Sequence, residues 1–329
     1  MSEFEAIYKY IDDLIKKSSN IAIITHISPD GDTLGSATAL CEVIMTNFKN
    51  KKVDIINKDS CGLFSFLPNS NKIIENFQLN KYDFVFIVDI ATLKLSWFWE
   101  NKKFIFGDKE LINIDHHITN WFYGDVNLVD SSTPAASIVL YDFFKHMWYI
   151  ITPDAATCLL TGIYTDTGAF AYSNVNKYSF EVTANLMEKW GDIWIIDREF
   201  FSSLNFKFLQ LYSIILSRLV TKDNYAVSYM TSDDLEKIWC SVEFNWGLIS
   251  PKLNHLSGVD YVIFLYQKWD GVKWSMRTNR DDFDLTKIAS KFSWWWHCKA
   301  SGFMIDWTLC DENWRIFVKK PDGELIYFS

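Results

Sequence analysis

The sequence predicts an α/β protein in which a doubly wound, mostly parallel sheet is joined by a helical connector to a smaller α/β domain. Short β-branched apolar runs alternate with helical stretches through the first half, as interior parallel strands alternate with their crossover helices. A long helical stretch follows, and a second series of strands and helices begins after it. The length of 329 residues suits about two domains of about 150 residues each.

The first domain is expected at residues 1–190. Strands are expected at 21–25, 53–56, 84–88 and 111–114, and helices at 34–48, 134–147 and 153–163. Short connections between such elements give right-handed crossovers and parallel strands. In these sheets, polar residues just past the carboxyl ends of the strands converge on the crevice that binds the ligand.

The helical connector is expected at 191–222 and the second domain at 223–329. The second series is AVSYM, a helix at 232–239, VDYVIFLYQ, VKWSMRTN, a helix at 284–292 and FMIDWTL. These elements predict a smaller α/β domain.

Composition excludes several classes of protein. The chain is 49% hydrophobic and 22% charged, which is ordinary for a globular protein, and no apolar run approaches the ~18 residues of a membrane span. The first residues form a charged amphipathic helix rather than a signal peptide. Six cysteines without a CxxC pair suggest neither disulfides nor a zinc site, so a cytoplasmic location is expected. A net charge of −9 argues against long duplex DNA as a partner.

Acidic residues and histidines gather after four apolar stretches. They are His26, Asp30 and Asp32 after the first strand, Asp89 after FVFIV, His116 and His117 after LINID, and Asp166 in TGIYTDTGAF. Taken singly, each Asp is a helix cap or turn residue, and each His is a surface or hydrogen-bonded side chain. Taken together in one crevice, the carboxylates would repel one another. Divalent cations relieve that repulsion, and this ligand set suits Mn²⁺.

These residues carry a resemblance. THISPDGDTLGS, VDIA, NIDHHITN and TGIYTDTGAF resemble, in order and spacing, the four motifs of the DHH phosphoesterase family. The length and the second half resemble its bacterial oligoribonuclease and pAp phosphatase (nanoRNase) branch, which has a DHH-associated C-terminal domain.

The resemblance implies a role for each residue. His26 and Asp30 would hold one Mn²⁺ ion, while Asp32, His116 and Asp166 would hold a second, with Mg²⁺ or Co²⁺ as possible substitutes. Asp89 would bridge the two ions as a catalytic ligand, and His117 would act on the substrate phosphate as a catalytic residue and hydrogen-bond donor. Two such ions activate water for attack on a phosphate ester.

The second domain would bind the rest of the substrate. WSMRTN (274–279) resembles the family's Ser-x-Arg-Ser/Thr strand, so Arg277 would clamp a phosphate, with Asn279 as a weaker candidate. The alternative for Arg277 is a solvated side chain on a strand. FSWWWHCKASGF (292–303) resembles the family's GGGH segment followed by KxAxGF. His297 matches the motif histidine that contacts phosphate, whereas the glycines do not match.

The resemblance therefore implies a Mn²⁺-dependent phosphoesterase that hydrolyses short oligoribonucleotides (nanoRNA) and 3′-phosphoadenosine 5′-phosphate (pAp), with no membrane association and a homodimeric state. The alternative within the family is a phosphodiesterase of cyclic or linear dinucleotides, c-di-AMP or pGpG. An alternative from another class is a catalytically silent nucleotide-binding module, which would lack at least one metal ligand.

Tryptophan is unusually frequent. The chain has 15 tryptophans and only 13 glycines, and tryptophans stand where loops are expected, including Trp294, Trp295 and Trp296 in place of the family's glycines. One interpretation is an aromatic platform that stacks bases. The preferred hypothesis is that UGA codons, which some bacteria read as glycine, have been written as tryptophan.

Overall fold

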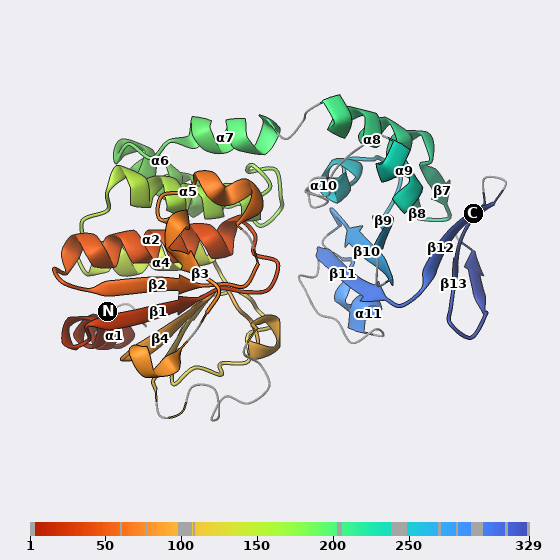
Figure 1. Ribbon diagram of the computed structural model, residues 1–329. Coiled ribbons are helices and arrows are strands. Elements are labelled where there is room, and N and C mark those ends of the chain that lie inside the picture. Colours follow the sequence, from red (N-terminus) through yellow and green to blue (C-terminus); the bar gives the residue numbers. More distant parts are fainter. Residues whose placement is uncertain are drawn as a thin grey trace. The chain divides into compact units, whose positions relative to one another are not determined.

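The structure is a computed structural model. It describes residues 4–59, 61–76, 78–97, 107, 109–202, 206–237, 249–268, 271–280, 282–290, 299–312 and 315–327. The chain divides into two compact units, Met1–Phe200 and Phe201–Ser329, and both appear in Figure 1. The domain division at 1–190, 191–222 and 223–329 stays a prediction.

A six-stranded sheet in the order β3-β2-β1-β4-β5-β6 forms the centre of the first unit. Every neighbouring pair of these strands is parallel, which confirms the predicted fold class. The strands are β1 (Asn20–Ile24), β2 (Lys52–Ile56), β3 (Ile73–Ile74), β4 (Phe84–Val88), β5 (Leu111–Asp115) and β6 (Val126–Val129). The sequence patterns predict β1, β2, β4 and β5 to within a residue or two. The short strands β3 and β6 carry no such pattern, because four residues or fewer give no periodicity to detect.

Helices cover one face of this sheet, as Figure 1 shows for α2, α4 and α5. The helices of this unit are α1 (Glu5–Lys17), α2 (Gly31–Asn47), α4 (Ala136–His146), α5 (Pro153–Asp166), α6 (Lys177–Glu188) and α7 (Ile193–Ser202). Ile21 and Ile23 of β1 point into the core beneath the helices. Ala22 and Ile24 point to the opposite face, where they cluster with Tyr82 and with Leu93 of the short 3-10 helix Leu93–Leu95. This alternation follows from the two-residue period of a strand.

Helices α2 and α5 pack closely against each other at Gly35. A Cβ atom added there would lie 2.4 Å from the Cys158 carbonyl oxygen and 3.0 Å from the Gly162 nitrogen, and backbone atoms cannot swing aside. We expect Gly35→Ala to lower the free energy of unfolding by about 1–3 kcal/mol, measured by urea unfolding. Thr46→Ala, at an exposed position of the same helix, should change it by less than about 0.5 kcal/mol. Equal stability of the two variants would contradict the close packing.

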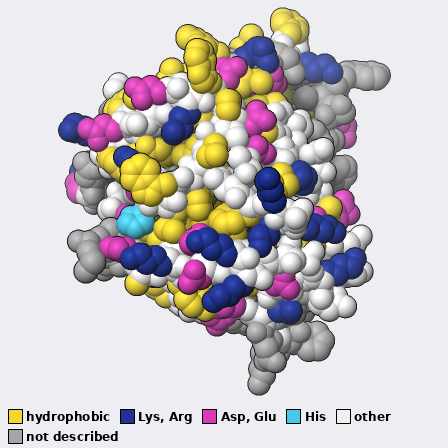
Figure 2. All heavy atoms as spheres, turned by 90° about the vertical axis from the view of Figure 1, so that its left-hand side faces the viewer, with side chains coloured by type: hydrophobic (Ala, Val, Ile, Leu, Met, Phe, Trp, Pro, Cys, Tyr) yellow, Lys and Arg dark blue, Asp and Glu magenta, His cyan; other side chains and the backbone are white. Residues whose placement is uncertain are grey.

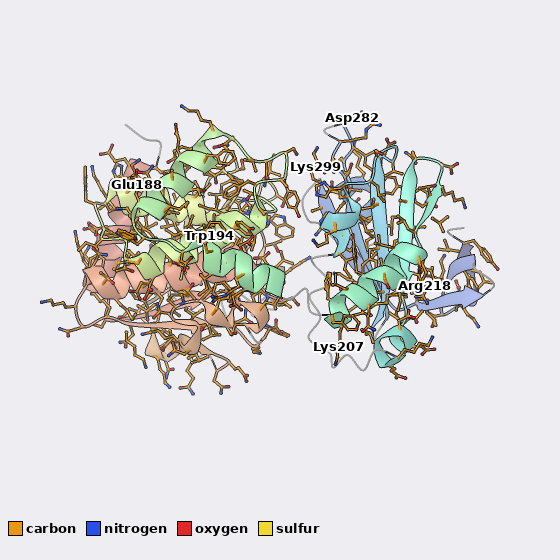
Figure 3. All side chains as sticks on the ribbon, turned by 90° about the horizontal axis from the view of Figure 1, so that it is seen from above. Glu188, Trp194, Lys207, Arg218, Asp282 and Lys299 are labelled. Atoms are coloured by element: carbon orange, nitrogen blue, oxygen red, sulfur yellow. The ribbon has the colours of Figure 1, made fainter. Side chains whose placement is uncertain are left out.

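The second unit contains two sheets. The larger follows the order β11-β10-β9-β8-β7, with β8 and β9 parallel and the other pairs antiparallel. Its strands are β7 (Val220–Lys222), β8 (Tyr225–Met230), β9 (Tyr261–Lys268), β10 (Gly271–Arg277) and β11 (Ala300–Ile305), and its helices are α8 (Phe206–Ser217), α9 (Ser232–Lys237), α10 (Ile249–Leu253) and α11 (Thr286–Ala289). Arg218, labelled in Figure 3, follows α8 and forms an ion pair with Asp234 of α9.

The smaller sheet, β12 (Thr308–Glu312), β13 (Arg315–Lys319) and β14 (Leu325–Tyr327), is antiparallel. No sequence pattern predicted this sheet. FMIDWTL, the last element of the predicted second series, is divided between β11 and β12 by a tight turn in which Trp307 N donates to Ile305 O at 2.8 Å. Throughout the described part of the chain, no helix has the length and apolar character needed to cross a bilayer.

Candidate metal centre

The predicted site residues meet where the strand order of the first sheet reverses. From β1 the chain proceeds to β2 on one side, whereas β4 lies on the other side and leads on to β5. Loops diverge at such a point and leave a crevice at the carboxyl ends of the strands. His26 lies two residues beyond the end of β1, and Asp89 directly follows β4. Their side chains approach to 3.6 Å between His26 Nε2 and Asp89 Oδ2.

The loop after β1 is held in place by Asn57, whose side-chain amide donates to the His26 carbonyl at 2.8 Å and to Thr25 Oγ1 at 2.6 Å. Asp30 then caps α2, since its Oδ1 accepts from the backbone N–H groups of Asp32 and Thr33 at 3.1 Å each. The cap does not remove Asp30 from the site. The same oxygen lies 3.5 Å from His26 Nε2, so the capping role and a ligand role are compatible.

Asp32 is fully buried and receives hydrogen bonds from a helix distant in sequence. Its Oδ2 accepts from Ala136 N at 2.6 Å, and its Oδ1 accepts from Ser137 N at 3.1 Å and from Ser137 Oγ at 2.7 Å. The positive end of the α4 dipole therefore stabilises this carboxylate. Asp32 Oδ2 also lies 3.8 Å from His116 Nε2.

Asp89 is the centre of the cluster and has a left-handed backbone, with φ of 59°. Such a conformation costs energy for a residue other than glycine and concentrates at functional sites. Asp89 Oδ1 lies 3.4 Å from His116 Nε2 and 3.6 Å from His117 Nδ1. It is buried and accepts no hydrogen bond from the described residues. A buried carboxylate oxygen in that situation fits a cation, because otherwise its desolvation is uncompensated.

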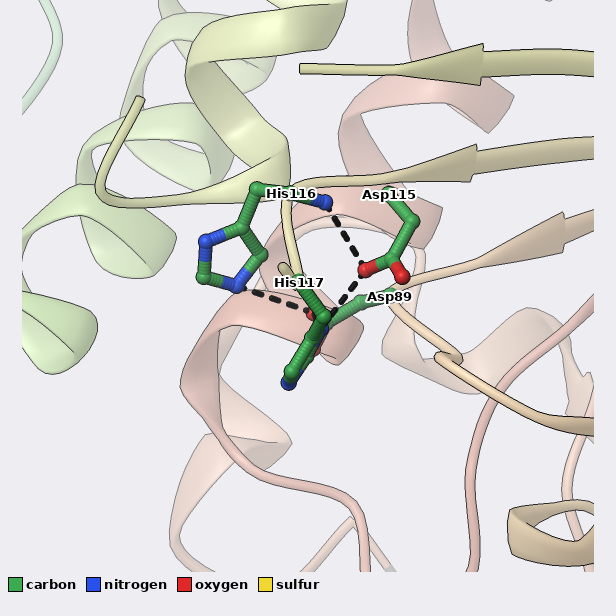
Figure 4. Close-up of side chains that lie close together, drawn as sticks. All are labelled: Asp89, Asp115, His116 and His117. Carbon is green, nitrogen blue, oxygen red and sulfur yellow. Dashed lines mark hydrogen bonds and ion pairs between the residues drawn. The ribbon is translucent and has the colours of Figure 1, made fainter. Parts of the chain in front are cut away.

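Asp115 holds the two histidines of the motif (Figure 4). Its Oδ1 accepts from His116 N at 2.8 Å and is 2.7 Å from His117 Nδ1, while its Oδ2 accepts from the Asn120 amide at 2.5 Å. Asn120 also accepts from the Asn113 amide at 3.1 Å. No role was predicted for Asn120 from its residue type. The only sequence signal was its position within NIDHHITN.

Asp166 is the last residue of α5, and its Oδ2 lies 3.3 Å from His116 Nε2. The candidate ligand atoms form three groups, and the atoms within each group lie within 4.8 Å of one another. The groups are His26, Asp30 and Asp89; Asp32, His116 and Asp166; and Asp89, Asp115, His116 and His117. The structure thus brings together all seven residues predicted for the first domain's site.

Burial and the neighbouring charges raise the pKa values of four side chains in the cluster. Burial, together with the neighbouring Asp89 carboxylate, raises the pKa of Asp32 to about 6. Burial and the charge of Asp32 raise the pKa of Asp166 well above its ordinary value. Burial opposes charging of His26, but Asp30 and Asp89 outweigh it and raise its pKa well above the usual range. The pKa of His116 is raised in the same way, against burial, by Asp89 and Asp166. The cluster therefore retains protons at neutral pH.

Cation binding should consequently release protons. His26 and His116 must lose theirs at neutral pH, and Asp32 holds one below about pH 6, so Mn²⁺ affinity should fall as the pH is lowered. Each proton released contributes up to about tenfold in affinity per pH unit. Calorimetry at pH 7 in two buffers of different ionisation enthalpy measures the number released. An affinity that does not change between pH 5.5 and 8 would contradict this protonation state.

The second unit contains the other predicted residues. Arg277 is half-buried at the end of β10, and its Nη1 donates to the Met276 carbonyl at 2.9 Å. Two hydrogen bonds of 2.6 Å join Asn279 to Asn254. The Asn254 side-chain amide donates to Asn279 Oδ1, and the Asn279 side-chain amide donates to the Asn254 backbone carbonyl. That pairing engages the Asn279 amide within the unit. His297 and the tryptophans at 294–296 lie outside the described residues. The substrate contacts of these residues stay predictions.

Carboxylates and imidazoles clustered where the strand order of a parallel sheet reverses are typical of enzymes that bind divalent metal ions. Comparison with known proteins shows where the likeness lies: residues 20–163 match the model of the DHH family, N-terminal domain. The matched range includes every predicted residue of the cluster except Asp166.

Relatives and a solved structure extend the likeness to most of the chain. A bifunctional oligoribonuclease and PAP phosphatase NrnA of Mycoplasma genitalium is 27% identical, over 88% of this chain and 90% of that protein. A probable bifunctional oligoribonuclease and PAP phosphatase NrnA of Streptococcus mutans is 25% identical, over 90% and 92%. An exopolyphosphatase-related protein from Bacteroides fragilis has the same fold, with a TM-score of 0.82 at 22% identity over 92% of this chain and 91% of that one.

Proposed function

We propose that this protein is a metal-dependent phosphoesterase that hydrolyses very short oligoribonucleotides and pAp. The observation that carries the proposal is the buried Asp89 carboxylate, which lies between His26 and His116 within 3.6 Å of both. Relatives named as oligoribonucleases and PAP phosphatases along nearly the whole chain support the substrate class.

The six proposed ligands fit two divalent cations. We assign His26 and Asp30 to one ion, Asp32, His116 and Asp166 to the other, and Asp89 to both. This assignment follows two of the three groups of candidate ligand atoms, His26, Asp30 and Asp89 on one side and Asp32, His116 and Asp166 on the other. Carboxylate oxygens and imidazoles suit Mn²⁺, and Mg²⁺ or Co²⁺ are possible substitutes. Bound cations would polarise the phosphate and lower the pKa of water.

His117 acts on the substrate rather than as a ligand in this proposal. The Asp115 carboxylate at 2.7 Å keeps the proton on His117 Nδ1 and fixes the plane of the ring. In the imidazolium form, Nε2 carries a second proton, which it donates to a phosphate oxygen. Asn120 supports this arrangement because it fixes the other oxygen of Asp115.

The second unit supplies substrate-binding residues in this proposal. Arg277 would bind a phosphate through its guanidinium fork, with Asn279 and His297 as further contacts. The net charge of −9 fits a short substrate, because a long strand needs an extended basic track. On the face drawn in Figure 2, basic and acidic side chains of the described residues are interspersed. A cytoplasmic location and a homodimeric state remain part of the proposal.

Hydrolysis assays with Mn²⁺ test the function directly. The substrates are a labelled diribonucleotide, pAp and c-di-AMP, and Asp166→Asn serves as the control for contaminating nucleases. We expect turnover of the first two substrates by the unsubstituted chain alone. Faster turnover of c-di-AMP would replace the proposal with a cyclic dinucleotide phosphodiesterase. Nucleotide binding without turnover of any substrate would identify a silent binding module.

A further inference from the structure

Helix α4 ends in a motif that ordinarily requires glycine. Its C-cap is Met147, and the next residue, Trp148, has a left-handed backbone with φ of 57°. Trp148 N donates to Lys145 O at 3.2 Å, and Tyr149 N donates to Phe144 O at 3.0 Å. These two bonds are the 5→2 and 6→1 pair of a Schellman motif, in which glycine normally occupies the left-handed position.

Helix α6 ends in the same way. Its C-cap is Lys189, and Trp190 has φ of 66°. Trp190 N donates to Met187 O at 2.9 Å, and Gly191 N donates to Leu186 O at 3.0 Å. Two helices of the first unit therefore carry tryptophan at the one position where the motif demands positive φ.

Little holds either indole in place. Trp148 is 91% exposed and Trp190 is 82% exposed, so burial of the rings does not offset the strain of the backbone. Among the described residues, the other aromatic residues with positive φ are Phe122 and Phe170. Phe122 is also 62% exposed, but its backbone N–H donates to a side chain, Asn120 Oδ1, at 2.6 Å. The Phe170 ring stacks on Phe180, with 5.3 Å between ring centroids.

We propose that positions 148 and 190 are glycine in the natural protein, and that the codons written here as tryptophan are UGA codons read as glycine. The structural observation is independent of composition, but it agrees with the ratio of 15 tryptophans to 13 glycines. Trp274 shows the contrast. It lies on β10, is 7% exposed, and stacks on Phe303 with 5.1 Å between ring centroids.

Stability of matched variants tests the physical argument. Trp148→Gly and Trp190→Gly should each raise the ratio of folded to unfolded chain by about 5- to 30-fold, measured by urea unfolding. Trp148→Ala and Trp190→Ala also remove the ring but keep Cβ, so we expect a change below about threefold. Trp194→Gly provides the opposite control, because Trp194 lies within α7 (Figure 3), is 78% exposed, and glycine weakens a helix. Equal gains from alanine and glycine would overturn the backbone argument.

Mass spectrometry of the protein isolated from its source cells tests the proposal itself. Proteolytic peptides that span positions 148 and 190 should each have the mass of the glycine form, and the gene should carry UGA at both codons. A tryptophan mass at either position would overturn the proposal, whatever the stability of the variants.

Discussion

Asp89→Asn is expected to lower kcat/KM for the diribonucleotide by at least about a thousandfold. Asp89 is the residue within 3.6 Å of His26, His116 and His117, so a neutral amide removes the charge shared by both groups of ligands. Electrostatic and metal contributions to phosphoester hydrolysis are of that order. The measurement is steady-state hydrolysis over a range of Mn²⁺ concentrations.

Asparagine is chosen because it tolerates the left-handed backbone of Asp89 better than most residues, so the variant should remain folded. Asp223→Asn is a matched control, since Asp223 also has positive φ, at 49°, and is exposed in the second unit. It should retain full activity. An Asp89→Asn protein with more than a tenth of the original kcat/KM would refute the central position of Asp89.

His117→Ala should separate catalysis from metal binding. We expect kcat to fall by about 10²- to 10⁴-fold, the usual contribution of a positioned acid or base, while Mn²⁺ affinity stays within about threefold, because His117 is not among the six proposed ligands. Calorimetry gives the affinity, and single-turnover hydrolysis gives the rate of the chemical step. His255→Ala, at an exposed histidine of the second unit, should change neither quantity. Loss of Mn²⁺ affinity in His117→Ala would instead make His117 a ligand.

Strand positions, and the gathering of the acidic residues and histidines that follow the strands, were predictable because both follow from local patterns. Apolar runs such as FVFIV become fully buried strands, and parallel strands place the residues after them at one edge. Asp32 shows where local patterns are insufficient. Its partners at Ala136 and Ser137 lie more than 100 residues away, and only the fold brings that helix terminus to the carboxylate.

The features that the sequence did not predict are short strands, an unusual backbone conformation and pairings that depend on tertiary contacts. Strands β3 and β14 contain two and three residues, too few for a periodic signal. The left-handed backbone of Asp89 leaves no trace in residue type. Asn279 illustrates a third limit, since a motif position indicates what a side chain is able to bind, whereas its pairing with Asn254 depends on tertiary contacts.

Metal dependence of diribonucleotide hydrolysis tests the central claim most directly. The protein is stripped of metal with a chelator, dialysed, and titrated with Mn²⁺ while product formation is followed. We predict no turnover in the stripped protein and full recovery as Mn²⁺ is added, with saturation at about two ions per chain. Turnover that persists after chelation would show that this cluster of aspartates and histidines is not a metal-dependent phosphoesterase centre.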